Sequence, residues 1–245
     1  MKLITIIMPY YRKIDYVNRA IKSVINQTYK KFELIIVYDD QNFEDYHKIK
    51  KFIADNKKIR IIKNKKNIGA GKSRNVGLKN SNGNIITFID SDDTWHPQKL
   101  KKQLNFLDKN NYNFIFCAYK KILKTRYIKV ITKSKYLDYK DLLRSCEIGL
   151  STVMIKKKII NNNLFTSLKT QEDFAAWLEI TKKNKAFFLN EVLVNWYETE
   201  NSLSSNFFQK IIDAFKVFYF HQKFSLIKSF YHLMIISTNS IKRKF

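Results

Sequence analysis

The chain has 245 residues, of which 45% are hydrophobic, and this content excludes intrinsic disorder as a description of the whole chain. Only 5 Gly and 2 Pro exclude collagen-like and Pro-rich classes, and 2 Cys cannot form a disulfide framework. The formal charge of +25 comes mainly from lysine, which is typical either of a solvated surface or of attraction for a polyanion, such as an anionic membrane or nucleic acid.

The first half of the chain alternates between strand and helix patterns. Near-continuous apolar runs are typical of strands buried on both faces of a sheet, whereas apolar residues at intervals of three and four indicate helices. Strands are expected at 3–8, 32–38, 60–63, 84–90 and 114–119, and helices at 17–25, about 43–55, from Gly71 to about 81, and after Pro97. This alternation predicts a parallel sheet with helices on both faces, in which ligands bind at the carboxyl ends of the strands.

The second half is less regular. Strands are expected near 127–131 and 150–156, and a helix around 172–183. An aromatic segment begins at Phe207, and its longest uncharged stretch, 13 residues, is shorter than the roughly 20 needed to span a bilayer. We therefore expect a catalytic or binding domain at 1–205 and a helical segment at 206–245. The first residues lack a signal-peptide cleavage site, and we expect a cytoplasmic protein.

Acidic residues follow two of the predicted strands. Asp90, Asp92 and Asp93 lie within four residues, where their mutual repulsion is costly unless a cation neutralises it. Their oxygens suit Mg²⁺ or Mn²⁺, which would also bind a diphosphate. The alternative is an acidic turn before the helix that follows Pro97. Asp40, with its acidic neighbour at 39, ends the strand 32–38, so both clusters are expected to face one crevice.

Two further motifs lie at predicted helix starts. The run GKS at 71–73 is not a phosphate-binding P-loop, because position 66 is Lys66 instead of the required glycine. Arg74 follows this run and either faces a phosphate or belongs to a structural turn. Glu172 and Asp173 begin another helix, where two carboxylates either satisfy the helix dipole or supply a general base.

Five segments together resemble the inverting family 2 glycosyltransferases of the GT-A fold. In chain order they are ITIIMPYY, SVINQTYKKFELIIVYDDQN, NIGAGKSRNVGLKNSNGNIITFIDSDD, QEDFAAWLEI and NSLSS, and the resemblance covers about residues 3–205. It implies a catalytic domain at 1–205 with a Rossmann-like, mainly parallel sheet flanked by helices, followed by a C-terminal helical extension at 206–245. It also implies an inverting transfer that depends on Mn²⁺ or Mg²⁺, from a nucleotide-sugar donor (a UDP-sugar is favoured) to a glycan or lipid-linked glycan.

The resemblance also implies a role for each matching residue. Asp173 would be the catalytic base with Glu172 beside it; Pro9, Tyr11 and Asp40 would contact the base and ribose; Arg74 would lie near the nucleotide; Asp90 and Asp92 would form the D-x-D pair; Asp92 and Asp93 would contact the ribose and the divalent metal. Trp177 would lie near the acceptor or in the core. Glu198 and Glu200 stand where the family often has Arg and His, so a degenerate partner of an active enzyme is an alternative.

The C-terminal segment allows two interpretations. Phe208, Ile211, Phe215 and Phe218 recur at helical spacing with lysines between them, as in an amphipathic helix lying on an anionic membrane. A helix packed on the domain would show the same pattern. The first interpretation suits synthesis of cell-surface polysaccharide or lipooligosaccharide at the cytoplasmic face of the inner membrane. A nucleic-acid-binding α/β protein is disfavoured by the scarce arginine and the acidic crevice, so no nucleic-acid partner is expected.

Overall fold

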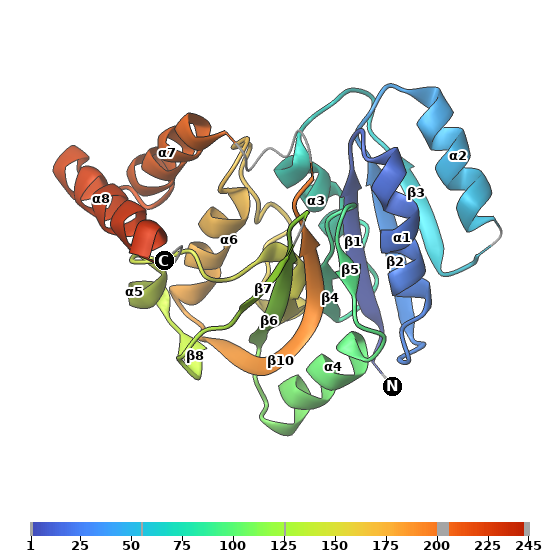
Figure 1. Ribbon diagram of the computed structural model, residues 1–245, viewed down its shortest axis with the longest axis horizontal. Coiled ribbons are helices and arrows are strands. Elements are labelled where there is room, and N and C mark those ends of the chain that lie inside the picture. The colour runs from blue at the N-terminus through green and yellow to red at the C-terminus, as the bar shows by residue number, and fades with distance from the viewer. Residues whose placement is uncertain (1, 55, 125, 200–205, 243–245) are drawn as a thin grey trace.

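The computed structural model describes residues 2–54, 56–124, 126–199 and 206–242, and Figure 1 shows a single sheet with helices packed on it. The predicted fold class, a mixed α/β sheet flanked by helices, is confirmed. The strands run β3 (Ile59–Lys63), β2 (Phe32–Tyr38), β1 (Ile4–Tyr10), β4 (Ile85–Phe88), β9 (Val153–Lys156), β6 (Phe114–Ile122), β10 (Ala186–Tyr197) and β5 (Thr94–Trp95) across the sheet. β7 (Tyr127–Val130) pairs with β6, and β8 (Tyr136–Leu137) pairs with β10.

The first half of the sheet is parallel, as the strand–helix alternation predicts. β3, β2, β1 and β4 all pair in parallel, and so do β6 and β10. The second half departs from this pattern, because β9 lies antiparallel between β4 and β6. β10 is not predicted from the sequence, because its register with β6 shifts between Leu189 and Val194 and the usual alternation is interrupted there.

Helices cover both faces of the sheet. α1 (Ile14–Ile25), α2 (Phe43–Ile53) and α4 (Lys99–Lys109) bury their apolar sides against one face, which contains Ile6 and Met8 of β1. α3 (Ala70–Lys79), α5 (Tyr139–Leu142) and α6 (Glu172–Thr181) cover the other face, which contains Ile7. Alternate residues of β1 thus enter different cores, as the two-residue period of a strand requires.

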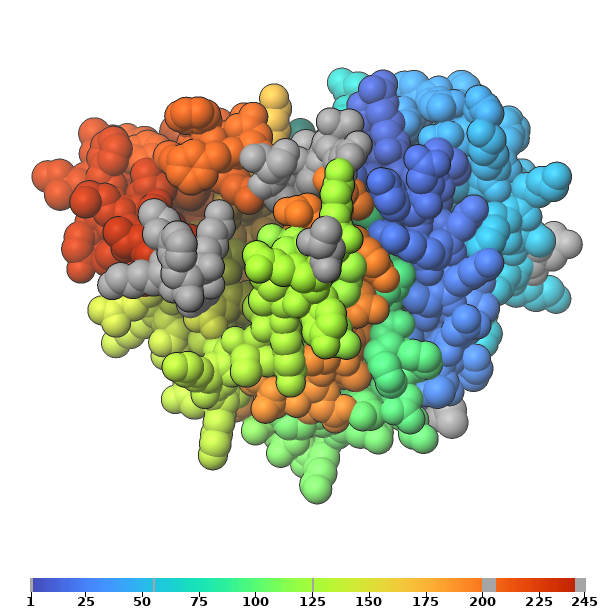
Figure 2. Space-filling view, viewed as in Figure 1, coloured from blue at the N-terminus to red at the C-terminus, as the bar shows by residue number. Residues whose placement is uncertain are grey.

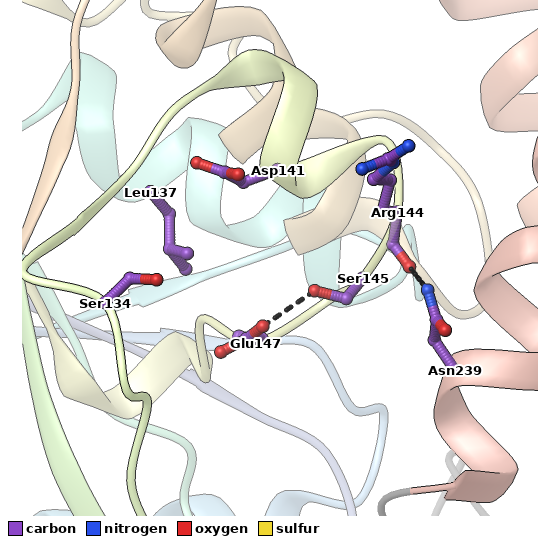
Figure 3. A pocket seen from close by; sticks show the side chains of 7 residues that line it. All are labelled: Ser134, Leu137, Asp141, Arg144, Ser145, Glu147 and Asn239. Atoms are coloured by element: carbon purple, nitrogen blue, oxygen red, sulfur yellow. Dashed lines mark hydrogen bonds between the residues drawn. The ribbon is translucent and has the colours of Figure 1, made fainter.

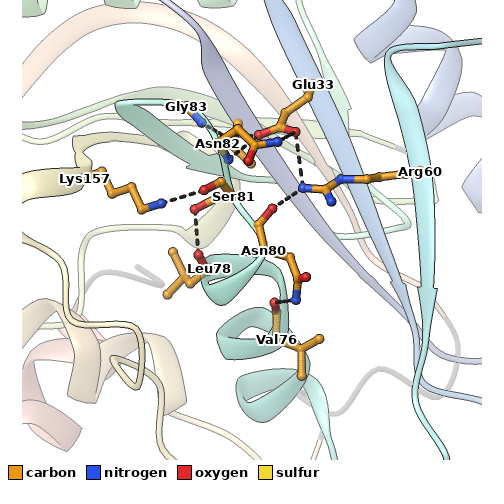
Figure 4. Close-up of polar contacts among 10 residues, drawn as sticks. Glu33, Arg60, Val76, Leu78, Asn80, Ser81, Asn82, Gly83 and Lys157 are labelled. Carbon is orange, nitrogen blue, oxygen red and sulfur yellow. Dashed lines mark hydrogen bonds and ion pairs between the residues drawn. The ribbon is translucent and has the colours of Figure 1, made fainter.

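The turn between α3 and β4 is fixed by polar contacts with neighbouring strands (Figure 4). The Glu33 carboxylate of β2 accepts a 2.6 Å hydrogen bond from the Asn82 backbone N–H and forms an ion pair with Arg60 of β3. A Cβ at Gly83 would approach the Thr5 backbone nitrogen to 2.7 Å, so only glycine fits against β1 there. These contacts set where β4 begins, and hence where its acidic carboxyl end lies.

The C-terminal segment forms two helices, α7 (Phe207–Lys216) and α8 (Leu226–Lys242), joined through a π-helical turn at Val217–His221. Figure 1 places them beyond α6, at the opposite end of the molecule from α2 and β3. The Phe218 ring meets Phe174 of α6 edge-on at 5.9 Å between centroids, and Tyr139 of α5 donates a 2.8 Å hydrogen bond to Gln222. Packing of this segment on the domain is therefore confirmed. Within the described ranges, no helix has both the length and the apolarity to cross a membrane.

The first residue of α4 is a lysine whose side chain lies in the core. Lys99 is fully buried; its Nζ lies 3.3 Å from Thr87 Oγ1 and 3.8 Å from the centroid of the Trp95 ring. Burial lowers the pKa of Lys99 to about 7, although the nearby Cys117 opposes this shift. The folded chain therefore disfavours a proton that the unfolded chain binds readily.

We expect Lys99→Met to stabilise the fold at neutral pH by on the order of 2–4 kcal/mol. Between pH 7 and about 10.5 the unfolded chain binds more protons at this side chain, so wild-type stability falls as the pH falls through that window. Methionine removes this loss. Urea unfolding at pH 7 and pH 10 tests the prediction, with Lys101→Met on the exposed side of α4 as the control. If the urea midpoint of Lys99→Met changed between pH 7 and pH 10 as much as that of the wild type, the prediction would be contradicted.

Candidate active site

The acidic strand ends lie on one edge of the sheet. β1 pairs in parallel with β2 on one side and β4 on the other, so the carboxyl ends of all three strands share the upper edge in Figure 1. Asp39 and Asp40 follow β2, and Asp90 to Asp93 lie just after β4. The chain thus brings its two acidic clusters to either side of the end of β1, as the sequence analysis expected from the sheet order.

The two aspartates after β2 have different partners. Asp39 accepts hydrogen bonds from the backbone N–H groups of Ile68 and Gly69 and from Asn64 Nδ2, at 2.8–2.9 Å, so it fixes the loop before α3. Asp40 Oδ1 accepts hydrogen bonds from the backbone N–H groups of the next two residues, Gln41 at 2.7 Å and Asn42 at 3.3 Å. Its other oxygen, Oδ2, is buried without a hydrogen-bond donor and forms a long ion pair, 3.9 Å, with Arg12 Nε. Asp40 therefore presents an acceptor that a bound ligand can satisfy.

The loop before α3 is shaped by glycine. Gly69 has φ +86°, a conformation that side chains other than glycine rarely adopt. A Cβ at Gly71 would lie 2.2 Å from the Thr166 carbonyl oxygen, so glycine there lets α3 approach the segment that leads to α6. This close approach brings Arg74 of α3 next to the start of α6.

Arg74 is buried and bridges two carboxylates. Its Nη1 donates to Glu172 Oε1 at 2.6 Å and its Nη2 to Asp90 Oδ1 at 2.8 Å. Burial lowers the pKa of Arg74, but the two carboxylates raise it by more than burial lowers it. Its pKa is therefore above the usual value and the guanidinium stays charged. Burial, with the charge of Asp92 adding to it, also raises the pKa of Asp90 against the opposing effect of Arg74.

Asp173 is the carboxyl group on this edge whose pKa lies near neutral pH. Burial raises its pKa to about 7, the adjacent Glu172 adds to the increase and Arg74 opposes it. Gln171, which lies directly before α6 and two residues before Asp173, adopts a left-handed conformation with φ 63°, and this redirects the chain where α6 begins. A carboxyl group that titrates near pH 7 is suited to take a proton from a hydroxyl group.

Asp92 and Asp93 lie in different surroundings. Asp92 Oδ2 accepts from Thr199 Oγ1 at 3.0 Å and lies 3.2 Å from Lys13 Nζ, while the side chain remains half-buried. Asp93 is buried, and its two oxygens accept from Ser151 Oγ at 2.5 Å and from the Tyr197 N–H at 3.3 Å. Burial raises the pKa of Asp93 well above its usual range, with Asp90 and Asp92 adding to it.

These surroundings limit how a metal could be held. In the part of the chain that the structure describes, no three His, Cys, Asp or Glu side chains gather closely enough to hold a metal ion by themselves. Mg²⁺ and Mn²⁺ are, however, commonly held by one or two carboxylates together with phosphate oxygens. Asp92 fits this arrangement, because its carboxylate is partly accessible and its contacts with Thr199 and Lys13 fall on one oxygen, Oδ2. A cation bound at that oxygen would have to displace the Lys13 ammonium. Asp93 is engaged with the protein at both oxygens.

The other residues singled out from sequence take varied positions. Pro9 is buried within β1, whereas the Tyr11 ring beyond it is 44% exposed at the same edge. Trp177 is fully buried and donates to the Ile148 carbonyl, so of its two interpretations the core residue is confirmed. Glu198 pairs with Lys121 at 3.8 Å. Glu200 and the NSLSS segment lie outside the described residues.

Three side chains at this edge were missed: Lys13, Ser151 and Thr199. Each contacts an aspartate of the D-x-D region from a distant part of the chain. Lys13 follows the PYYR run by one residue, which was the only available signal. A separate cavity of about 340 Å³ lies between Leu137 and α8, at the far end of β10, and none of the predicted site residues lines it (Figure 3).

The model of glycosyl transferase family 2 matches residues 5–178, which include the acidic clusters after β2 and β4, Arg74, Glu172 and Asp173 but not Glu198, Thr199 or Glu200. The chain belongs to this family. An uncharacterized glycosyltransferase of Haemophilus influenzae is 33% identical over 98% of the chain and 96% of its own length. The Escherichia coli beta-1,3-glucosyltransferase WfgD, named for UDP-Glc and alpha-D-GlcNAc-diphosphoundecaprenol, is 31% identical over 85% of the chain and 82% of its own length.

Solved structures of glycosyltransferases have the same fold. Residues 1–349 of Staphylococcus aureus TarS in complex with UDP-GlcNAc superpose with a TM-score of 0.73 at 20% identity, covering 95% of this chain and 70% of that TarS chain. The mannosyltransferase PcManGT of Pyrobaculum calidifontis, in complex with GDP-Man and Mn²⁺, has a TM-score of 0.68 at 12% identity, covering 94% of this chain and 69% of its own. As a family 2 glycosyltransferase, the chain therefore has the GT-A architecture that its sequence predicts.

Proposed function

We propose that this glycosyltransferase moves a sugar from a nucleotide-sugar donor, with a UDP-sugar favoured, to a hydroxyl group of a lipid-linked glycan, with inversion. The observation that carries the proposal is Asp173, a carboxyl with its pKa raised to about 7 beside the edge where Asp40 and Asp92 lie. The relatives support the choice of substrates, because WfgD is named for UDP-Glc and a diphosphoundecaprenol-linked acceptor. Such a reaction belongs to cell-surface polysaccharide synthesis at the cytoplasmic face of a membrane.

The donor nucleotide is assigned to the end of β1 and β2. Asp40 Oδ2 accepts no hydrogen bond within the protein and pairs only at 3.9 Å with Arg12 Nε, so it can accept from an N–H group of the base. The exposed Tyr11 ring, which the Arg12 guanidinium approaches to 5.1 Å, offers a face for stacking beside it. Pro9 holds the backbone that leads to Tyr11. Arg74 is assigned a positioning role, because both of its terminal nitrogens already bind carboxylates. It holds the Asp90 and Glu172 carboxylates together.

The sugar transfer is assigned to Asp173. In its deprotonated form it accepts the proton of the acceptor hydroxyl as that oxygen attacks the anomeric carbon, and the nucleoside diphosphate leaves from the opposite face. One displacement of this kind inverts the configuration, through a transition state with oxocarbenium character. A divalent cation held by Asp92 and the diphosphate would neutralise the negative charge of the leaving group. Asp93, whose two oxygens accept from Ser151 Oγ and the Tyr197 N–H, is assigned a positioning role instead of a metal ligand's.

Replacement of Asp92 and of Asp93 in turn tests the proposal that Asp92 holds the cation and Asp93 does not. We expect Asp92→Asn to raise the Mn²⁺ concentration for half-maximal activity at least about tenfold, because one charged ligand is lost. Release of nucleoside diphosphate from UDP-, GDP- and CDP-sugars, measured across a Mn²⁺ series, gives this concentration. Asp93→Asn should leave it unchanged, and so should Asp15→Asn on the exposed side of α1. If Asp92→Asn and Asp93→Asn raised this Mn²⁺ concentration equally, both aspartates would have to be metal ligands.

A further inference from the structure

The C-terminal segment carries most of the exposed large hydrophobic side chains that the structure describes. Nine of the fifteen exposed large hydrophobic side chains in the described part of the chain lie between 207 and 234. On α8, Ile227, Phe230, Tyr231 and Met234 follow the spacing of one helix face. On α7, Phe208 and Ile212 are exposed in the same way. Patches of this kind on a protein surface mark a site of interaction.

The apolar faces of the two helices join into one surface. The rings of Phe215 on α7 and Phe230 on α8 lie 4.8 Å apart between centroids, so they link the stripe on one helix to the stripe on the other. Figures 1 and 2 show both helices on the outside of the molecule, beyond α6. We call this joined surface, formed by the outward sides of α7 and α8 around Phe215 and Phe230, the helical face.

The charges around the helical face have one sign. The sequence from 206 to 245 contains seven Lys+Arg and one acidic residue, Asp213. Asp213 is buried, and its Oδ2 accepts from the backbone N–H and Oγ1 of Thr170 at 2.9 and 3.0 Å. Lys223 and Lys228, by contrast, are exposed among the aromatic residues. The outside of the two helices therefore presents positive charge and apolar side chains together.

We propose that the helical face docks on an anionic lipid bilayer, with the aromatic and aliphatic side chains inserted at the boundary between headgroups and acyl chains. Lysines at the level of the phosphates gain electrostatic attraction, and the apolar area gains burial. A second copy of the chain fits the surface less well, because lysine is depleted in the centres of protein interfaces. The docked helices are tied to the candidate base, since Asp213 binds Thr170, three residues before Asp173.

Sedimentation with vesicles tests the proposal, and it needs neither donor nor acceptor, so its failure would say nothing against the proposed transfer. We expect the full chain to bind phosphatidylcholine vesicles that contain phosphatidylglycerol, to bind pure phosphatidylcholine much more weakly, and to lose binding as salt rises. The triple variant Phe208→Ser, Ile227→Ser, Met234→Ser should bind at least about tenfold more weakly. These side chains are 67–84% exposed, so the urea midpoint should stay unchanged.

Two matched controls separate this face from the general properties of the chain. Tyr127→Ser, Ile128→Ser, Ile131→Ser removes three exposed apolar side chains elsewhere and should bind like wild type. Lys223→Gln with Lys228→Gln should weaken binding on the order of tenfold, whereas Lys101→Gln with Lys109→Gln on α4 should have little effect. Absence of wild-type binding, or equal loss in both serine triples, would overturn the proposal. A dimer in light scattering that the helical triple dissociates would assign the face to a second copy instead.

Discussion

Asp173→Asn is expected to lower kcat by on the order of 10²–10⁴-fold, because asparagine cannot accept the proton of the attacking hydroxyl. In the wild type the pKa of Asp173 is raised to about 7, so the active, deprotonated form decreases as the pH falls below 7. We therefore expect kcat/KM to fall about tenfold per pH unit on the acidic side and to level off above pH 8. Product release measured from pH 5 to pH 9 gives this profile.

The same substitution is expected to stabilise the protein above pH 7. The folded chain binds the Asp173 proton more tightly than the unfolded chain, so the stability that this proton contributes is lost as the pH rises through about 7. Asparagine avoids the charged form, and a gain of about 2 kcal/mol at pH 8 is expected. Urea unfolding at pH 5 and pH 8 measures it, and Asp15→Asn on α1 serves as the control.

An inactive variant with an unchanged midpoint at pH 8 would mean that Asp173 is not strained in its charged form. An active variant would remove Asp173 as the base altogether. The combination of lost activity with gained stability is the signature that distinguishes a catalytic carboxyl held in a costly environment from one that supports the fold.

The parts of the fold that follow from local patterns were predictable. The apolar runs of β1, β2 and β4 are long enough to identify buried strands, and parallel pairing then places Asp40 and Asp92 at one edge. β10 was not predictable in this way, because its residues pair with β6 through a shifted register, with Asn190 and Glu191 in the middle of the strand. Its role depends on neighbours that are distant in sequence.

Adjacent aspartates could not be told apart from sequence. Asp39 and Asp40 are identical in type, yet Asp39 is saturated by the loop before α3 whereas Asp40 keeps an open oxygen. Asp92 and Asp93 also differ, because Ser151 and the Tyr197 N–H engage both oxygens of Asp93, whereas Thr199 and Lys13 reach Asp92 at Oδ2. Which carboxylate is free for a ligand is decided by hydrogen-bond donors that arrive from other elements.

The C-terminal segment shows why two interpretations of one pattern need not compete. A helical period of aromatic residues cannot tell whether a helix packs on a protein or on a lipid surface. Here Phe218 packs into the domain against Phe174, while Ile227 and Met234 remain exposed on the outside. The two helices therefore have apolar residues on two sides, and only the inner side is used by the fold.

Arg74→Met is expected to destabilise the protein by about 3–5 kcal/mol, the cost of leaving buried carboxylates without their cation. Arg74 is the ion-pair partner of both Asp90 and Glu172, at 2.8 and 2.6 Å. Arg74→Lys should recover only part of the loss, because an ammonium group cannot match the planar guanidinium that binds both carboxylates. Arg60→Met is the control, since Arg60 forms a half-exposed ion pair with Glu33, for which at most about 1 kcal/mol is expected.

The pH profile shows whether Arg74 also serves the reaction. Because Arg74 lowers the pKa of Asp173 against burial and Glu172, its removal should move the acidic midpoint of kcat/KM to higher pH. Adding Glu172→Gln removes one of the stranded carboxylates, so the double variant should regain stability and shift the midpoint back toward that of the wild type. Destabilisation without a shifted midpoint would restrict Arg74 to the fold. Both effects together would establish it as the residue that keeps the base ready near neutral pH.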